Sequence, residues 1–127
     1  MVRFAANTIV IDDSAPEFIL VGFADDRNGH YREALHFQRS YKFDERDAAL
    51  GMDGVYVERN DQRQGGYGAV ERVELLRNRL RVVVGGQVVQ RLGDREFEID
   101  LSLSDEEFER VRKGLQAVFN GFSTLIE

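Results

Sequence analysis

The sequence predicts an α+β domain: a mainly antiparallel curved sheet of about six or seven strands with one C-terminal helix packed on it. Three observations predict this class. Several runs alternate apolar and polar residues, turn residues separate these runs, and only the C-terminal part has the helical period. With 127 residues, of which 43% are hydrophobic and 31% charged, residues 1–127 are predicted to form a single domain with an ordinary core.

The N-terminal third predicts three strands. Residues 3–11 and 17–24 flank a turn that contains Pro16, so we expect them to form a hairpin. The second run is apolar at successive positions, which indicates a strand covered on both faces. A polar loop at residues 25–29 then leads to residues 35–43, which alternate again and predict a third strand.

Three further strands are predicted to form a meander in the middle of the chain. They cover residues 55–59, 67–76 and 79–84, and Arg77-Asn78 makes the last turn. Residues 87–92 are predicted to form one or two helical turns. Residues 96–103 alternate most clearly, with acidic residues on one face, and we expect Arg79 or Arg81 to pair with these acids across the strands.

The last predicted element is a helix that begins with the capping box Ser104 to Glu107. Its apolar residues Phe108, Val111, Leu115, Val118 and Phe119 have helical spacing, and Asn120-Gly121 ends it. Gly114 lies inside this helix at a cost of about 1 kcal/mol relative to alanine, which indicates a close backbone contact there. The tail that follows is expected to stay docked on the sheet.

Composition limits the function classes. The chain has no cysteine and no apolar run long enough to span a bilayer, and its first residues alternate as a strand does rather than as a secretory h-region does. We therefore expect a cytoplasmic protein without membrane contact. Its formal net charge of −6 opposes nucleic-acid binding. We recognise no catalytic set, no metal ligands and no cofactor motif, and His36 is expected to face solvent. A homodimer through a sheet edge is compatible with the sequence.

Two charges occupy positions where alternation predicts apolar side chains. Arg39 falls in the run with Leu35 and Phe37, and Glu71 falls in the run with Val73 and Leu75. We expect the two charges to pair between neighbouring strands. The pair has two interpretations: a structural ion pair within the sheet, or part of a polar pocket with Tyr41 and Tyr67.

The loop at residues 44–54 contains Asp44, Glu45, Asp47 and Asp53. Their spacing does not match an EF-hand, so we expect a solvated acidic loop that is suited to partner contact. Tyr67, in the Gly65-Gly66-Tyr67-Gly68 segment, is a second candidate contact residue. No lysine and hydroxyl pair follows these glycines, which therefore predict a turn or bulge with close backbone approach and not a phosphate site.

Several segments together resemble the immunity protein 10 family of bacterial polymorphic toxin systems. They are Phe37-Gln38-Arg39-Ser40, Leu50-Gly51-Met52-Asp53, Val55-Tyr56-Val57-Glu58 and the run from Gly66 to Leu75. The resemblance implies a non-catalytic protein that binds a co-encoded toxin domain and blocks it inside the producing cell. It offers no catalytic motif to transfer.

The sequence leaves two functional hypotheses open. The first is an immunity protein that contacts its toxin through residues 44–54 and 60–68, and through the acidic strand face Glu96, Glu98 and Asp100. The alternative is a small-molecule-binding or enzymatic domain whose pocket surrounds Arg39 and Glu71.

Overall fold

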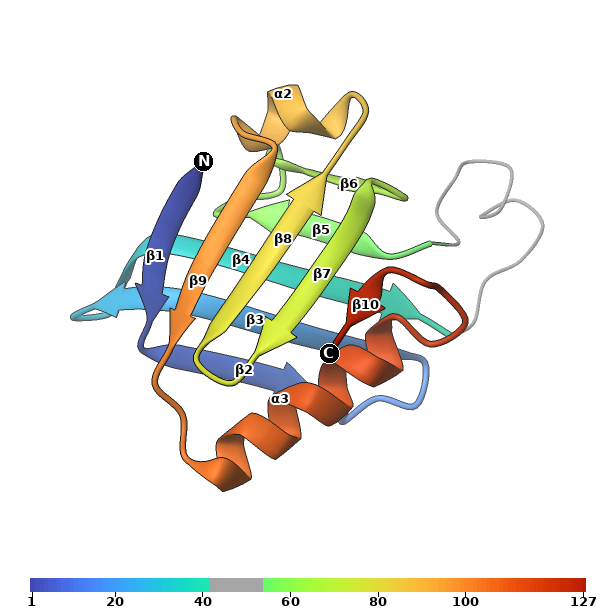
Figure 1. The fold of residues 1–127 in the computed structure, drawn as a ribbon. Helices are drawn as coiled ribbons and strands as arrows, with labels where there is room; N and C mark the ends of the chain where they lie inside the picture. The colour runs from blue at the N-terminus through green and yellow to red at the C-terminus, as the bar shows by residue number, and fades with distance from the viewer. Residues whose placement is uncertain (42–53) are drawn as a thin grey trace.

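A computed structural model describes residues 1–41 and 54–127, and two five-stranded sheets pack face to face in it (Figure 1). Sheet A contains, in spatial order, β1 (Val2–Ala6), β9 (Glu96–Leu101), β8 (Arg79–Val84), β7 (Val70–Leu76) and β10 (Leu125–Ile126). Sheet B contains β2 (Thr8–Asp12), β3 (Phe18–Arg27), β4 (His30–Ser40), β5 (Tyr56–Arg59) and β6 (Gly65–Tyr67). The α+β class is confirmed, but the described strands form two sheets of five where the sequence predicted one of six or seven.

The chain first changes sheets at Asn7. The strand predicted at residues 3–11 is therefore two strands, β1 in sheet A and β2 in sheet B. The Asn7 side chain holds this corner, because its Oδ1 accepts from the Asp26 N–H and its Nδ2 donates to the Asp26 carbonyl, both at 2.8 Å.

The second change of sheet occurs at Gly68, whose φ of +66° favours glycine. The strand predicted at residues 67–76 is consequently divided into β6 and β7. Pairing with β8 then skips Glu71, since Val70 lies opposite Val84 and Arg72 opposite Val83. Glu71 is the extra residue of a β-bulge, which shifts the alternation of side chains along β7.

The strands β3 and β4 form a hairpin and are both longer than the strands that the sequence predicted at residues 17–24 and 35–43. Residues 25–29, predicted as a loop, lie largely in strand, and only Asn28-Gly29 forms the turn. Both turn residues have positive φ, +57° and +85°, as a type I′ turn requires. The Asn-Gly pair was the signal that predicts such a hairpin.

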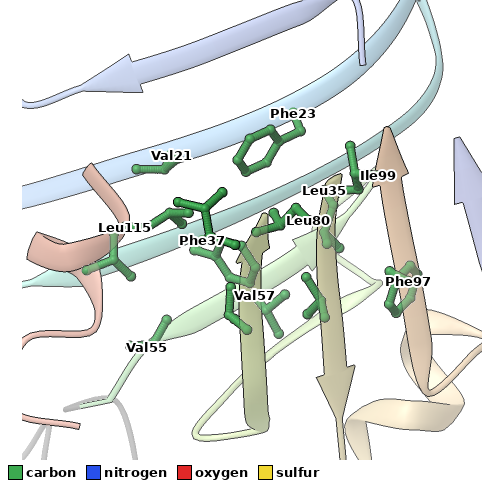
Figure 2. Close-up of a cluster of buried hydrophobic side chains, with 14 of the residues drawn as sticks. Val21, Phe23, Leu35, Phe37, Val55, Val57, Leu80, Phe97, Ile99 and Leu115 are labelled. Carbon is green, nitrogen blue, oxygen red and sulfur yellow. The ribbon is translucent and has the colours of Figure 1, made fainter. Parts of the chain in front are cut away.

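The core lies between the two sheets, whose strands cross in Figure 1. Figure 2 shows Val21, Phe23, Leu35, Phe37 and Val57 of sheet B facing Leu80, Phe97 and Ile99 of sheet A. All eight side chains are at most 1% exposed. Burial of this apolar surface is the main force that holds the sheets together.

Two helices pack at opposite ends of the space between the sheets (Figure 1). The helix α3 (Asp105–Val118) begins with the predicted capping box, in which Ser104 Oγ accepts from the Glu107 N–H. Its Gly114 meets β3 so closely that an added Cβ would lie 3.0 Å from Val21 Cγ2. The expected close contact is confirmed, and so is the docked tail, because β10 pairs with β7.

The short helix α2 (Val88–Leu92) confirms the helical turns predicted at residues 87–92, and buries Val88 and Leu92. It lies on β6, where an added Cβ at Gly66 would be 2.9 Å from Val88 Cγ2. The glycines of this segment thus permit close packing, as the sequence predicted.

Candidate partner-binding surface

The face of sheet B that points away from sheet A is the candidate surface, and we call it the outer face of sheet B. Strand register places two rows of side chains across it: Val10, Gly22, His36, Glu58 and Gly65 in one, and Asp12, Leu20, Gln38, Tyr56 and Tyr67 in the other. Successive residues of a strand point to opposite faces, and the intervening Val21, Phe37 and Val57 are buried in the core. The two rows therefore face outward.

Three residues of these rows form what we call the tyrosine cluster: Tyr56, Glu58 and Tyr67. The Tyr56 hydroxyl donates to Glu58 Oε1 at 2.8 Å, and the ring centroids of Tyr56 and Tyr67 are 5.0 Å apart. Gly65 makes this arrangement possible, because a Cβ there would lie 2.4 Å from the Tyr56 hydroxyl oxygen. The Tyr56 side chain thus rests directly on the backbone of β6.

The pKa of Tyr56 is raised to about 12, mainly by burial and secondly by the hydrogen bond to the Glu58 carboxylate. Its hydroxyl therefore keeps its proton at neutral pH and remains a donor to Glu58. His36 Nδ1 lies 3.8 Å from Glu58 Oε2, too far for a hydrogen bond. Burial lowers the pKa of His36 despite this neighbouring carboxylate, and its side chain is 25% exposed where the sequence predicted a solvent-facing ring.

His36 should make the stability of the protein depend on pH. The unfolded chain protonates it near its ordinary pKa of 6.5, whereas the folded chain does so only at lower pH. Between these pKa values the unfolded state binds more protons, so the free energy of unfolding falls as the pH drops through this interval. We expect His36→Gln to lose this part of the slope in urea unfolding measured from about pH 7.5 to about pH 5. His30→Gln is the control, and an unchanged slope in His36→Gln would contradict the assignment.

A shallow pocket of about 130 Å³ adjoins the cluster, with Val10, Gly22 and His36 among its lining residues. Gly22 keeps it open, because an added Cβ would lie 3.2 Å from the Cβ of His36. Nearby side chains are unusually exposed for their type: Val10 43%, Tyr31 62% and Tyr67 40%. Exposed tyrosines beside apolar side chains are typical of protein interfaces.

The outer face of sheet A differs, because its charges neutralise one another. Register places Arg3, Glu98, Arg81 and Glu74 in one row of alternating sign. Glu98 lies within 4 Å of three arginines, Arg3, Arg79 and Arg81, at 3.8, 3.7 and 3.4 Å. The predicted pairing with Arg79 and Arg81 is confirmed. Glu98 and Asp100 are therefore not free acids for a partner, while Glu96 is exposed.

The predicted pair of Arg39 and Glu71 is wrong. Arg39 Nη1 donates to the carbonyls of Val118 and Asn120, at 3.2 and 2.5 Å, and caps the C-terminal end of α3. Glu71 pairs instead with Arg95 at 3.2 Å. The two residues lie in different sheets, and the chain changes sheets and bulges between them, so one alternation pattern could not place both. The pocket proposed around this pair is not formed by them.

Arg39 should therefore matter for stability. Its guanidinium also lies 5.1 Å from the ring centre of Phe122 and 5.8 Å from that of Tyr41. We expect Arg39→Met to lower the free energy of unfolding by about 2 kcal/mol, because charged hydrogen bonds to the helix end are lost. Urea unfolding measures this, with Arg32→Met on the same strand as the exposed control. A loss no larger than that of the control would contradict the capping role.

The sequence did not reveal a second capping residue, Arg59. Like Arg39, it caps the C-terminal end of a helix, at the other end of sheet B. Its Nη1 donates to the Leu92 carbonyl at 2.6 Å, at the end of α2, and its Nε donates to Glu33 Oε1 at 2.6 Å. Arg59 follows Val55 and Val57 at the spacing of two, so alternation puts a charged residue on the apolar face of this strand. That position was the signal that could have identified it.

Of the predicted contact residues, Tyr67 lies in the tyrosine cluster of the outer face of sheet B. Asp44, Glu45, Asp47 and Asp53 lie outside the described residues. Among residues 1–41 and 54–127, no helix has the length and apolar character needed to cross a membrane.

Comparison with known proteins identifies the family. The family model described as immunity protein 10 matches residues 5–109. No curated protein and no solved structure gives a significant match to the chain. The matched region includes β2 to β9 and most of the outer faces of both sheets. Because the match spans well over half of the sequence, the chain belongs to the immunity protein 10 family.

Proposed function

We propose that this protein is an immunity protein that binds and neutralises a co-encoded bacterial toxin domain in the cytoplasm of the producing cell. Neutralisation occurs by stoichiometric protein–protein binding and not by catalysis. Membership of the immunity protein 10 family carries this proposal. The exposed aromatic and apolar side chains on the outer face of sheet B support it, since such side chains are typical of protein interfaces.

The toxin domain binds, in this proposal, on the outer face of sheet B, with Tyr67 as a contact residue. The acidic residues Asp44, Glu45, Asp47 and Asp53 are further proposed contacts. A negative protein suits a partner with a basic active site, because opposite charges accelerate association.

Co-expression tests this function. The C-terminal domain encoded beside this chain is induced in a bacterial host, with and without the protein on a second plasmid. We expect growth arrest with the domain alone and normal growth when the protein is present. The control is an unrelated acidic protein of similar size, expressed to the same level. Arrest that persists with abundant, folded wild-type protein would refute the proposal.

A further inference from the structure

We infer that the tyrosine cluster, Tyr56, Glu58 and Tyr67, accepts one basic side chain, arginine or lysine, from the toxin domain. The inference rests on the proposed function and adds the chemistry of its central contact. It follows from three properties of the outer face of sheet B: an available carboxylate, a pair of aromatic rings of which one is bonded to it, and no arginine or lysine in the two outward rows of described residues.

The carboxylate of Glu58 is held in place, but only one of its two oxygen atoms accepts a hydrogen bond from the described residues. Tyr56 donates to its Oε1, and no donor of the described chain lies within hydrogen-bond distance of its Oε2. A carboxylate oxygen of this kind can accept a charge-assisted hydrogen bond from a guanidinium or an ammonium group. The Glu58 side chain is 14% exposed, so a cation that reached it would be largely removed from water and would interact strongly.

The two tyrosine rings suit the same ligand. Their centroids are 5.0 Å apart with an interplanar angle of 46°. Tyr56 lies on the same strand as Glu58 and is bonded to it, and Tyr67 lies opposite Tyr56 on β6. Aromatic faces attract cations, and most strongly where water is excluded. Tyr56 is fixed by its hydrogen bond to Glu58 and by its packing on Gly65. Binding would therefore order few side chains, which reduces the entropic cost.

The charges on the two sheets select this face for a cation. The two outward rows of sheet B contain Asp12 and Glu58 but no arginine or lysine. On the outer face of sheet A, in contrast, Arg3, Arg79 and Arg81 already surround Glu98. A basic side chain that approached Glu98 would meet arginines first, whereas one that approached Glu58 would meet an anion.

The residues around the tyrosine cluster resemble those around a binding hot spot of a protein interface. The pocket of about 130 Å³ and the exposed Val10 and Tyr31 lie to the side of the cluster, on the same sheet. Apolar contacts around a central charged pair exclude water and strengthen it. The basic side chain therefore occupies the cluster, while neighbouring residues of the toxin domain cover the apolar pocket.

Binding of the purified toxin domain, measured by biolayer interferometry, tests the inference. We expect Glu58→Gln and Tyr67→Leu each to weaken binding by about 10-fold or more, because one removes the anion and the other an aromatic face. Tyr67→Phe keeps the ring and should stay within about 3-fold of wild type. Glu74→Gln, on the outer face of sheet A, is the control for loss of a charge. Thermal unfolding verifies that every variant is folded.

A double-mutant cycle identifies the partner residue. Each exposed arginine and lysine of the toxin domain is replaced by methionine and measured against both wild type and Glu58→Gln. One basic residue should lose most of its effect in the Glu58→Gln background. If wild type binds but Glu58→Gln and Tyr67→Leu stay within about twofold of it, or every pair is additive, the inference is wrong. If folded wild type does not bind the domain at all, the proposed function itself fails.

Discussion

Replacing Arg59 by methionine should lower the free energy of unfolding by about 3 kcal/mol. The Arg59 side chain is 18% exposed and its partner Glu33 17%, so both charges are largely buried. The substitution leaves Glu33 without its two hydrogen bonds, at 2.6 and 3.1 Å, and leaves the Leu92 carbonyl uncapped at the end of α2. It also removes a cation 5.6 Å from the ring centre of Phe97.

Urea unfolding measures the effect, and Arg63→Met provides the matched control. Arg63 lies four residues further along, with a side chain that is 91% exposed, and its loss should cost less than about 0.5 kcal/mol. The double variant Arg59→Met/Glu33→Gln should recover part of the lost stability, because a neutral amide then replaces the unpaired carboxylate. Equal losses in the single and double variants would show that Glu33 is not the reason for the destabilisation.

Gly114→Leu should also destabilise the protein, by about 3 kcal/mol. Even a Cβ at this position would lie 3.0 Å from Val21 Cγ2, and Val21 is fully buried at the centre of the core. Three further carbon atoms cannot fit unless α3 moves away from β3. Such a movement would expose Leu115 and Val118, which are fully buried on the same helix.

Lys113→Leu is the matched control for this substitution. It places the same side chain one residue earlier, at an exposed position of α3, and should change the free energy of unfolding by less than about 0.5 kcal/mol. If Gly114→Leu were as stable as this control, the close packing of α3 on β3 would be refuted.

The two arginines explain how the ends of sheet B are built. Arg39 and Arg59 both occupy inward positions, opposite Ile19 and Leu35 in the strand register. Each extends past the edge of the core to the carbonyls at the end of a helix, Arg39 to α3 and Arg59 to α2. The charge at an apolar position of the Arg39 strand was therefore a real signal, but it marked a helix cap and not an ion pair with Glu71.

The sequence predicted individual helices, strands and turns better than it predicted how the strands are divided between sheets. Local patterns located the capping box, the tight turn at Arg77-Asn78 and the helical turns at residues 87–92, since each depends on neighbouring residues. The division into two sheets depends on Asn7 and Gly68, where continuous alternation conceals a change of direction. The pairing of Arg39 with Glu71 failed because it assumed one sheet.

The candidate surface could be predicted only in part. Tyr67 was identified from its position beside glycines, but its neighbours Tyr56 and Glu58 reach it through strand register, which sequence alone does not supply. The acidic face at Glu98 and Asp100 was predicted as a contact region. Its arginine partners come from β1 and β8, and the N-terminal Arg3 had no signal that linked it to β9.

The central claim is stoichiometric, non-catalytic neutralisation, and one titration tests it most directly. The purified toxin domain is titrated with this protein in a calorimeter, and both chains are then weighed by mass spectrometry. The account predicts a single binding transition that ends at one equivalent, with both masses unchanged. Absence of binding heat across several temperatures, or a covalent change in the toxin domain caused by a small fraction of an equivalent, would contradict it.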